Sequence, residues 1–398
     1  MKTILLLGGA AQQVVAIDTA RRLGYRTVLC DYLPDNPGQF HADKFYLVST
    51  TDMEAVLEVA KSEKVDGILS YASDPAAPTA AYVAEKLALP TNSYASVDIL
   101  CNKDKFRCFL KSNGFNAPAS RGYSNVNDAM HDSGEYCLPV IVKPVDSSGS
   151  KGATVLRSWD GLETALGHAF AFSRGHRVII EEFIEKKHPY LIGGDIFVVN
   201  GRIVLWGLLN CHRDSHVNPL VPVGKSYPLM LDDSDRINVE KTLQGIVDKL
   251  GIRFGAMNVE LIVSVDGRVW PIDIGPRNGG NMIPDLLGMI FSVDVVEMTV
   301  KAAMDGGLCE FSLGAGIPYY ATHNLHSDRN GVFRTVSFSA ELERKIVRRE
   351  IYKKTGDKVE YFDNASKAIG IVFMKFDCME EMMQMLGDIK RHVRIELD

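Results

Sequence analysis

The sequence predicts a mixed fold, α/β in its first part and α+β in the rest, and three observations lead to it. Short apolar runs alternate with helical patterns over residues 1–95, which is the rhythm of a small doubly wound parallel sheet. The pattern changes to strand pairs and hairpins over residues 138–277, and residues 318–398 contain further strand-rich stretches. A length of 398 residues suggests two or three domains, which we expect to pack as one body.

Composition excludes several classes of protein. Hydrophobic residues make up 46% and charged residues 24% of the chain, which is ordinary globular composition and argues against disorder. A net charge of −6 gives no bulk attraction to nucleic acid or to an anionic membrane. No apolar run approaches the ~18 residues of a transmembrane helix. The seven scattered cysteines have no metal-ligand spacing, so we expect reduced, buried thiols in a cytoplasmic protein.

The first region has the strands and helices of βαβ units. Its opening apolar run stops after four residues, so we interpret it as a strand and not as a signal peptide. The turn Gly8–Gln13 lacks the spacing of G-x-G-x-x-G, and a nicotinamide cofactor is therefore not supported. Asp31, which ends the second strand, could hold a ribose hydroxyl or could equally be a helix cap or loop residue. We expect strands at 4–7, 27–30 and 67–71 and helices at 14–23 and 53–61.

The next feature is a lysine on a strand that we expect to be buried. A helix is expected over 102–111, with Gly114 as its C-cap. Strand 139–144 then carries Lys143 and leads into a loop rich in Gly and Ser, whose N–H groups and hydroxyls can approach phosphate oxygens. It is not a P-loop, and a mobile hairpin turn is the alternative. The candidate phosphate ligands in this loop are Ser147, Ser148, Gly149, Ser150 and Gly152.

A possible purine site follows the apolar strand 178–180. Glu181 and Glu182 come directly after it, and Phe183 and Ile184 follow. Such a segment can offer backbone C=O and N–H groups to an adenine edge, with the two apolar side chains as walls. Many strands end in two glutamates, so this pattern by itself has low specificity.

The most informative segment is a hairpin that opposes two acidic side chains. Asp266 and Gly267 separate two β-rich runs and predict a two-residue turn. Glu260 then lies directly opposite Asp273, an arrangement in which like charges destabilise a sheet. A magnesium ion held by both carboxylates and by nucleotide phosphates would compensate that repulsion. The alternatives are a solvent-exposed pair and a register that differs by one residue.

Other polar residues lie near this hairpin in the sequence or the register. Asn258 falls opposite Gly275, on the same face as the two carboxylates. Arg277 sits just beyond the hairpin, where a guanidinium could receive a phosphoryl group or an oxyanion; an ordinary ion pair is the alternative. His212, Arg213 and His216 could line an acceptor pocket, although a solvent-facing loop is the favoured interpretation. The basic run 344–354 predicts a solvated helix face, and a further helix is expected over 379–392.

Taken together, these segments resemble the ATP-grasp superfamily of carboxylate-activating ligases. The motifs look most like those of the group that contains carbamoyl-phosphate synthetase large chains, amino-acid ligases and phosphoribosylamine–glycine ligases. Residues 255–260 are similar to the first metal-ligand strand of that group, and 102–107 resemble its Asp-Lys helix start. The spacing of residues along this helix matches Lys103, and not Lys105, to the lysine that contacts phosphate in the family. The implied fold has a Rossmann-like preceding domain (1–100), linker helices with a lid subdomain (101–186), and a C-terminal catalytic domain with its β-rich completion (187–398).

The resemblance also implies roles for individual residues. Lys143 contacts the α- and β-phosphates, residues 147–152 form the flexible lid, and Glu181–Ile184 hold adenine. Asp195 is the candidate for the ribose. Glu260 and Asp273 match the metal-binding carboxylates, and Arg277 matches the arginine that faces an acyl phosphate. We expect four cations to converge on one cleft: Lys103, Lys143, Lys151 and Arg277.

Two positions depart from the family pattern. The family usually has Glu where this chain has Asp273, and a metal-ligating Asn where it has Gly275. Aspartate still supplies oxygen ligands, whereas glycine supplies none. We therefore hypothesise that Asn258 partly fills the role of the missing ligand.

The function implied by the resemblance is ligation of a carboxylate to an amine. ATP would activate the carboxylate as an acyl phosphate, with Mg²⁺ as the metal and Mn²⁺ as the alternative ion. The expected partners are small-molecule carboxylate and amine substrates, and the expected assembly is a homodimer. One alternative is a catalytically weak, ATP-binding regulatory relative, which Gly275 motivates. A dinucleotide oxidoreductase is another, and it rests only on the N-terminal βαβ pattern.

Overall fold

The computed structural model describes residues 1–147, 149–307 and 312–398. Its N-terminal sheet is parallel, with strand order β3-β2-β1-β4. All five residues of β1 are buried, as expected of a parallel strand covered on both faces. The predicted βαβ pattern is thus confirmed. Its elements are β1 (Thr3–Leu7), α1 (Val14–Arg22), β2 (Arg26–Asp31), β3 (Lys44–Leu47), α2 (Met53–Glu63), β4 (Gly67–Leu69), α3 (Ala77–Lys86) and α4 (Tyr94–Cys101).

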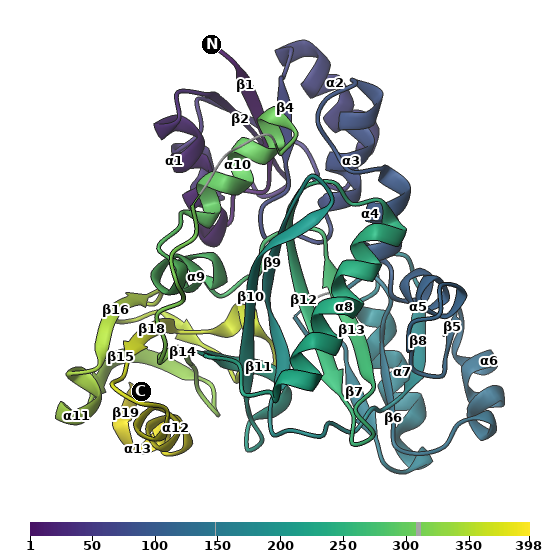
Figure 1. Ribbon diagram of the computed structural model, residues 1–398, viewed down its shortest axis with the longest axis vertical. Coiled ribbons are helices and arrows are strands. Elements are labelled where there is room, and N and C mark those ends of the chain that lie inside the picture. The colour runs from purple at the N-terminus through teal and green to yellow at the C-terminus, as the bar shows by residue number, and fades with distance from the viewer. Residues whose placement is uncertain (148, 308–311) are drawn as a thin grey trace.

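A helix from much later in the chain completes the core of this first region. Helix α10 (Val295–Asp305) lies beside α1 and β4 (Figure 1), and its Val296 and Val300 pack in one cluster with Ile4. Gly67 permits the close approach, because a Cβ there would lie 2.6 Å from the carbonyl oxygen of Ala303. The core of the N-terminal sheet is therefore discontinuous in sequence.

The second sheet carries the strand that bears Lys143. Its order is β5-β8-β6-β7 and its pairs are antiparallel. Leu166 and Ala169 pack in the same cluster as Val140 and Val178, so α7 covers this sheet. Its elements and flanking helices are α5 (Lys103–Ser112), β5 (Ser120–Tyr123), α6 (Val126–His131), β6 (Val140–Pro144), β7 (Thr154–Leu156), α7 (Leu162–Ala171) and β8 (Val178–Glu182).

The largest sheet has eight antiparallel strands in the order β13-β12-β9-β10-β11-β14-β18-β16. Leu243 of α8 packs with Ile196, whereas Leu286 of α9 packs with Phe197, so the two helices cover opposite faces of β9. The elements are β9 (Leu191–Val199), β10 (Arg202–Asp214), β11 (Asn218–Tyr227), α8 (Asp233–Leu250), β12 (Gly255–Val263), β13 (Val269–Gly275), α9 (Ile283–Phe291), β14 (Tyr320–Leu325), β16 (Ile346–Ile351) and β18 (Gly370–Lys375).

The C-terminal region differs from the sequence prediction in two places. The basic run 344–354 is not a helix face, because residues 346–351 form β16, which pairs with β18 and alternates half-buried with exposed residues. The helix expected over 379–392 is divided at Asp388. The remaining elements are β15 (Gly331–Phe338), α11 (Ala340–Glu343), β17 (Lys358–Val359), α12 (Met379–Gly387), α13 (Ile389–His392) and β19 (Val393–Leu397).

Among the helices of the described ranges, none is long and apolar enough to cross a membrane.

Candidate functional site

A cavity of about 810 Å³ lies where the Lys143 sheet meets the largest sheet. Most of the predicted site residues line it: Lys103, Lys143, Ser147, Gly149, Ser150, Glu181, Glu182, Phe183, Ile184, Asn258, Glu260, Asp273 and Arg277. Lys151 lines it too, so all four expected cations face one cavity. Gly152 and Asp195 are not among its lining residues. Ser148, which we predicted as a phosphate ligand, lies outside the described residues.

Lys143 is held in a buried ion-pair network. Its ammonium contacts Glu181, which Arg107 also binds through two of its nitrogens, at 3.0 and 3.3 Å. Glu181 and Arg107 are 2% and 1% exposed. Burial alone raises the pKa of the Glu181 carboxyl, but Arg107 and Lys143 outweigh it and hold that pKa below its usual value. The Glu181 side chain, predicted to help hold adenine, is thus engaged in fixing the lysine.

Arg107 and Lys103, both on α5, also contact β13 of the largest sheet. Arg107 donates a third hydrogen bond, of 2.7 Å, to the carbonyl oxygen of Ile272 in β13. The Nζ atom of Lys103 donates to the carbonyl of Ser147 at 2.7 Å and lies 3.7 Å from Asp273. Lys105 instead pairs with the half-buried Asp98 at 2.5 Å and does not line the cavity. Of the two lysines, Lys103 therefore lines the cavity and Lys105 does not.

The β12–β13 hairpin opposes the predicted carboxylates. Glu260 pairs with Asp273, and Asn258 pairs with Gly275, so the predicted register is confirmed at the site. The turn is different, however. Ser264 and not Val265 pairs with Arg268, which leaves a three-residue loop with Gly267 at φ +76°.

A β-bulge compensates for that longer turn. Glu260 pairs with Asp273, but the next residue, Leu261, pairs with Pro271. Ile272 of β13 is therefore an extra residue without a partner on β12. The carbonyl that Arg107 binds belongs to this bulged residue. The bulge therefore restores the predicted pairing of the two carboxylates.

Both carboxylates are accessible from the cavity and each has one cation nearby. The Glu260 and Asp273 side chains are 30% and 34% exposed. Arg213 lies 3.4 Å from Glu260, and Lys103 lies 3.7 Å from Asp273. In the described part of the chain no group of three His, Cys, Asp or Glu side chains is arranged to bind a metal. Two carboxylates that open onto a nucleotide-sized cavity fit Mg²⁺, which retains waters and phosphate ligands.

Comparison with known proteins places this geometry in a family. Residues 102–309, slightly more than half of the chain, match the carbamoyl-phosphate synthase L chain, ATP binding domain. The chain belongs to this ATP-grasp family. It is 26% identical over 312 residues to the carbamoyl phosphate synthase large chain of Thermotoga petrophila; the match covers 77% of this chain but 28% of that protein. The chain thus spans just over a quarter of that relative.

Solved structures share the ATP-grasp fold along the whole chain. An L-amino acid ligase from Bacillus licheniformis has a TM-score of 0.80 at 19% identity and covers 100% of this chain and 99% of its own. The biotin carboxylase domain of the Hydrogenobacter thermophilus 2-oxoglutarate carboxylase, a dimer in complex with MgADP and bicarbonate, has a TM-score of 0.74 at 15% identity. That match covers 100% of this chain and 91% of the other.

One assignment in this ATP-grasp chain requires correction. Asp195 was the candidate for the ribose, but its carboxylate is 1% exposed and does not line the cavity. It accepts hydrogen bonds from the backbone N–H of Gly279 at 2.8 Å and from the amide of Asn258 at 2.9 Å. Asp195 therefore supports the loop that follows Arg277. The register of β9, which the sequence alone does not provide, sets this position.

The structure also answers two of the alternatives that the sequence left open. Asp31 accepts hydrogen bonds from the backbone N–H groups of Gly9 and Leu33, which is the loop role. His212 and Arg213 belong to β10 and line the cavity, so the favoured interpretation as a solvent-facing loop was wrong for them, whereas His216 is 83% exposed in its side chain.

Several segments of the chain form the walls of the cavity. Ile184 packs with Ile262 and Trp270, and this cluster provides the apolar wall beside the predicted adenine segment. Ser150 of the phosphate loop donates a hydrogen bond of 2.9 Å to the carbonyl of Leu220. The loop is therefore in contact with β11 in this conformation.

Sequence reasoning missed one buried pair in the cavity wall. Lys225 and Cys211 are 5% and 1% exposed, and the lysine ammonium lies 2.6 Å from the thiol sulfur. Both line the cavity. They belong to neighbouring strands, β10 and β11, that pair at these two residues. Only the strand register brings them together, and no local motif marks either residue.

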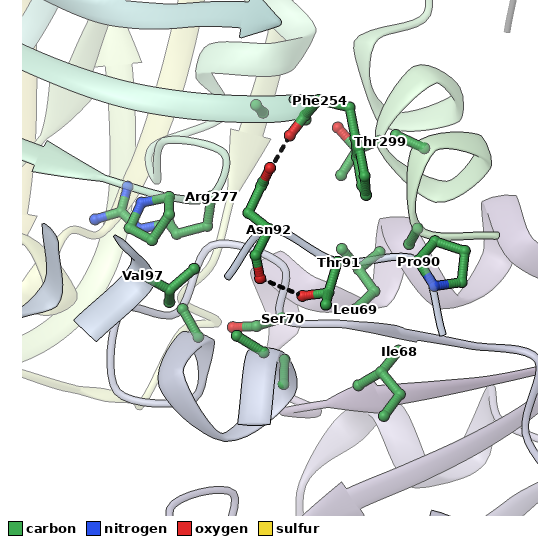
Figure 2. A pocket seen from close by; sticks show the side chains of 18 of the residues that line it. Ile68, Leu69, Ser70, Pro90, Thr91, Asn92, Val97, Phe254, Arg277 and Thr299 are labelled. Carbon is green, nitrogen blue, oxygen red and sulfur yellow. Dashed lines mark hydrogen bonds between the residues drawn. The ribbon is translucent and has the colours of Figure 1, made fainter. Parts of the chain in front are cut away.

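A second, smaller cavity of about 100 Å³ adjoins Arg277. It lies between the N-terminal region and the largest sheet, and Figure 2 shows Asn92 within it, bonded to Phe254 and Thr91. Arg277 lines this cavity as well as the larger one. The arginine therefore stands at the junction of the two regions.

Proposed function

We propose that this protein is an ATP- and Mg²⁺-dependent ligase that joins a carboxylate to an amine and releases ADP and phosphate. The observation that carries the proposal is the opposition of Glu260 and Asp273 at the wall of a cavity. Lys103, Lys143 and Arg277 face the same cavity. Two carboxylates and three cations are the groups that phosphoryl transfer to a carboxylate requires.

The residues divide the work between binding and charge stabilisation. Lys143, fixed by Glu181, and Lys103, fixed at Ser147, would position the phosphates of ATP. Glu260 and Asp273 would hold Mg²⁺, or Mn²⁺ as the alternative ion, which neutralises phosphate charge. Arg277 would then face the acyl phosphate and stabilise the oxyanion when the amine attacks. The loop at 147–152 would exclude water from that intermediate.

Further parts of the proposal concern the adenine segment and the partners. Ile184 and Phe183 would enclose adenine beside Glu182, and Asn258 would offer its amide oxygen to the metal. The substrates would be small molecules and not nucleic acid. The biotin carboxylase domain with this fold is a dimer, which supports a homodimer here. Of the free thiols among the described residues, Cys30 and Cys211 are buried, whereas Cys108, Cys137 and Cys378 are exposed, so the expectation of buried thiols is wrong for those three. Free thiols support a cytoplasmic location.

A regulatory ATP-binding relative is the second candidate, and Gly275 favours it because glycine gives the metal no side-chain oxygen. The two candidates differ in one measurement. A ligase forms ADP and phosphate only when its substrates are present, whereas the regulatory protein binds ATP without that turnover.

The test is a screen of purified protein with ATP, Mg²⁺ and pools of carboxylates and amines, followed by phosphate release. Glu260→Gln should abolish the substrate-dependent signal, whereas Glu163→Gln, on the exposed side of α7, should retain it. Retained turnover in Glu260→Gln would show that the metal assignment is wrong. ATP binding with no turnover across the pools would favour the regulatory candidate.

A further inference from the structure

Arg277 is paired with a carboxylate from the other end of the chain. Its Nη2 atom donates to Asp74, which lies in the loop between β4 and α3. The two side chains are 11% and 17% exposed. Because the pair joins residues 203 positions apart, it links the N-terminal region to the arginine that we place opposite the acyl phosphate.

Few other contacts hold the guanidinium. Nη1 donates to the carbonyl of Asn278 at 3.0 Å. The Nε atom is buried and has no hydrogen-bond partner within the described residues. The direction of the guanidinium therefore depends on Asp74 and on one neighbouring carbonyl. Truncating Asp74 would leave a buried cation with a single fixed bond.

The same carboxylate explains the glycine at position 275. A Cβ atom on Gly275 would lie 2.5 Å from Oδ1 of Asp74 and 3.1 Å from Cζ of Arg277, and a contact of 2.5 Å cannot be accommodated without a shift. Gly275 is not among the glycines with positive φ, so backbone conformation does not require it. The space that a side chain would occupy is taken by the Asp74–Arg277 pair.

We propose that Asp74 is the positioning residue for Arg277, and that Gly275 is glycine because the carboxylate of Asp74 occupies the space of its side chain. This inference rests on the proposed function for the task of Arg277, but the coupling of Asp74 with Gly275 does not. The departure from the family pattern at 275 then goes together with the presence of Asp74. A side chain is absent on β13, and a carboxylate from the N-terminal region stands in its place.

The first experiment separates positioning from binding. Asp74→Asn keeps the shape and removes the charge, so kcat should fall by about 10- to 100-fold, as expected when a reacting group is misplaced. The Kd for ATP should stay within about twofold, because Lys103 and Lys143 are untouched. Asp35→Asn, an exposed carboxylate of the same region, should change neither quantity. Full kcat in Asp74→Asn would overturn the proposal.

The second experiment needs no activity. Gly275→Ala should lower the unfolding midpoint of the otherwise unchanged protein. In an Asp74→Ala background the same substitution should lower the midpoint by less than half as much, because the clashing oxygen is gone. Equal costs in both backgrounds would overturn the proposal. If the unchanged protein shows no ligase turnover, the proposed function fails. The double-mutant cycle of unfolding midpoints still decides whether Asp74 and Gly275 are coupled.

Discussion

Glu260 lies directly opposite Asp273 although the hairpin that joins them has a longer turn than its sequence predicts. The longer turn takes one extra residue, Val265, from the β12 side of the hairpin, and the bulge adds one extra residue, Ile272, on β13. Because the two offsets lie on opposite strands, they cancel at the site. The same bulge presents the carbonyl that Arg107 binds. The pairing of the carboxylates thus depends on a local irregularity that an ion-pair network holds in place.

Removing one carboxylate should separate metal binding from folding. Glu260→Gln should alter the stability of the nucleotide-free protein little, because it relieves repulsion from Asp273 while leaving Arg213 without its partner. At a concentration of MgATP about 100 times Kd, the unchanged protein should gain about 2.7 kcal/mol. The variant should gain much less in the same thermal-shift measurement. An equal gain would mean that Glu260 does not bind the metal complex.

Two lysines on one helix provide a matched pair. Lys103→Met should weaken ATP binding by about 10- to 100-fold, since a charge-assisted hydrogen bond contributes about 1.5–3 kcal/mol. Lys105→Met should leave the affinity within about twofold, because Lys105 pairs with Asp98 away from the cavity. Calorimetric titration with a non-hydrolysable ATP analogue measures both. A larger effect at Lys105 would reverse the assignment.

Arg107→Met should be strongly destabilising. It leaves the buried Glu181 with Lys143 alone and the Ile272 carbonyl without its donor, and breaking a buried pair costs about 3–5 kcal/mol. Arg107→Lys should not restore stability, because one ammonium cannot replace the bidentate guanidinium. Urea unfolding measures these free energies. Arg121→Gln, at an exposed ion pair, should cost no more than about 1 kcal/mol.

The pH dependence of stability should include a contribution from His323. Burial, together with the charges of His326 and His212, lowers the pKa of its imidazole to about 3. A histidine with a depressed folded-state pKa stabilises the fold above pH 6.5, and that contribution is lost as the pH falls. The loss between pH 7 and pH 5 should be about 2 kcal/mol.

The matched variants for this measurement are His323→Asn and His216→Gln. Between pH 7 and pH 5, the free energy of unfolding of His323→Asn should fall by about 2 kcal/mol less than that of the unchanged protein. Urea unfolding at both pH values measures this difference. His216→Gln, at an exposed side chain, should follow the unchanged protein. Parallel pH profiles for all three proteins would contradict a neutral, buried His323.

The sequence predicted those site features that neighbours along the chain encode. The opposition of Glu260 and Asp273 followed from alternation within one hairpin, and Lys143 followed from a strand and its loop. Arg107, Lys225 and Asp74 were missed because their partners are distant in sequence. Strand order and register bring these residues together, and a single sequence does not contain that information.

Two errors in the elements have different physical causes. Helix α8 was overlooked within a region interpreted as strands, although its buried Val239, Leu243 and Ile246 follow a helical period. The helix face predicted at 344–354 is an edge strand instead. Charged residues at the edge of a sheet discourage pairing with other chains, and a basic run is equally compatible with that role.

The packing of α10 on the N-terminal sheet has a consequence for synthesis at the ribosome. Val296 and Val300, which share a cluster with Ile4 and Leu6, emerge about 290 residues after them. At a translation rate of about 5–20 residues per second, one apolar face of the nascent sheet waits tens of seconds for its cover. We expect that face to be a binding site for chaperones during translation.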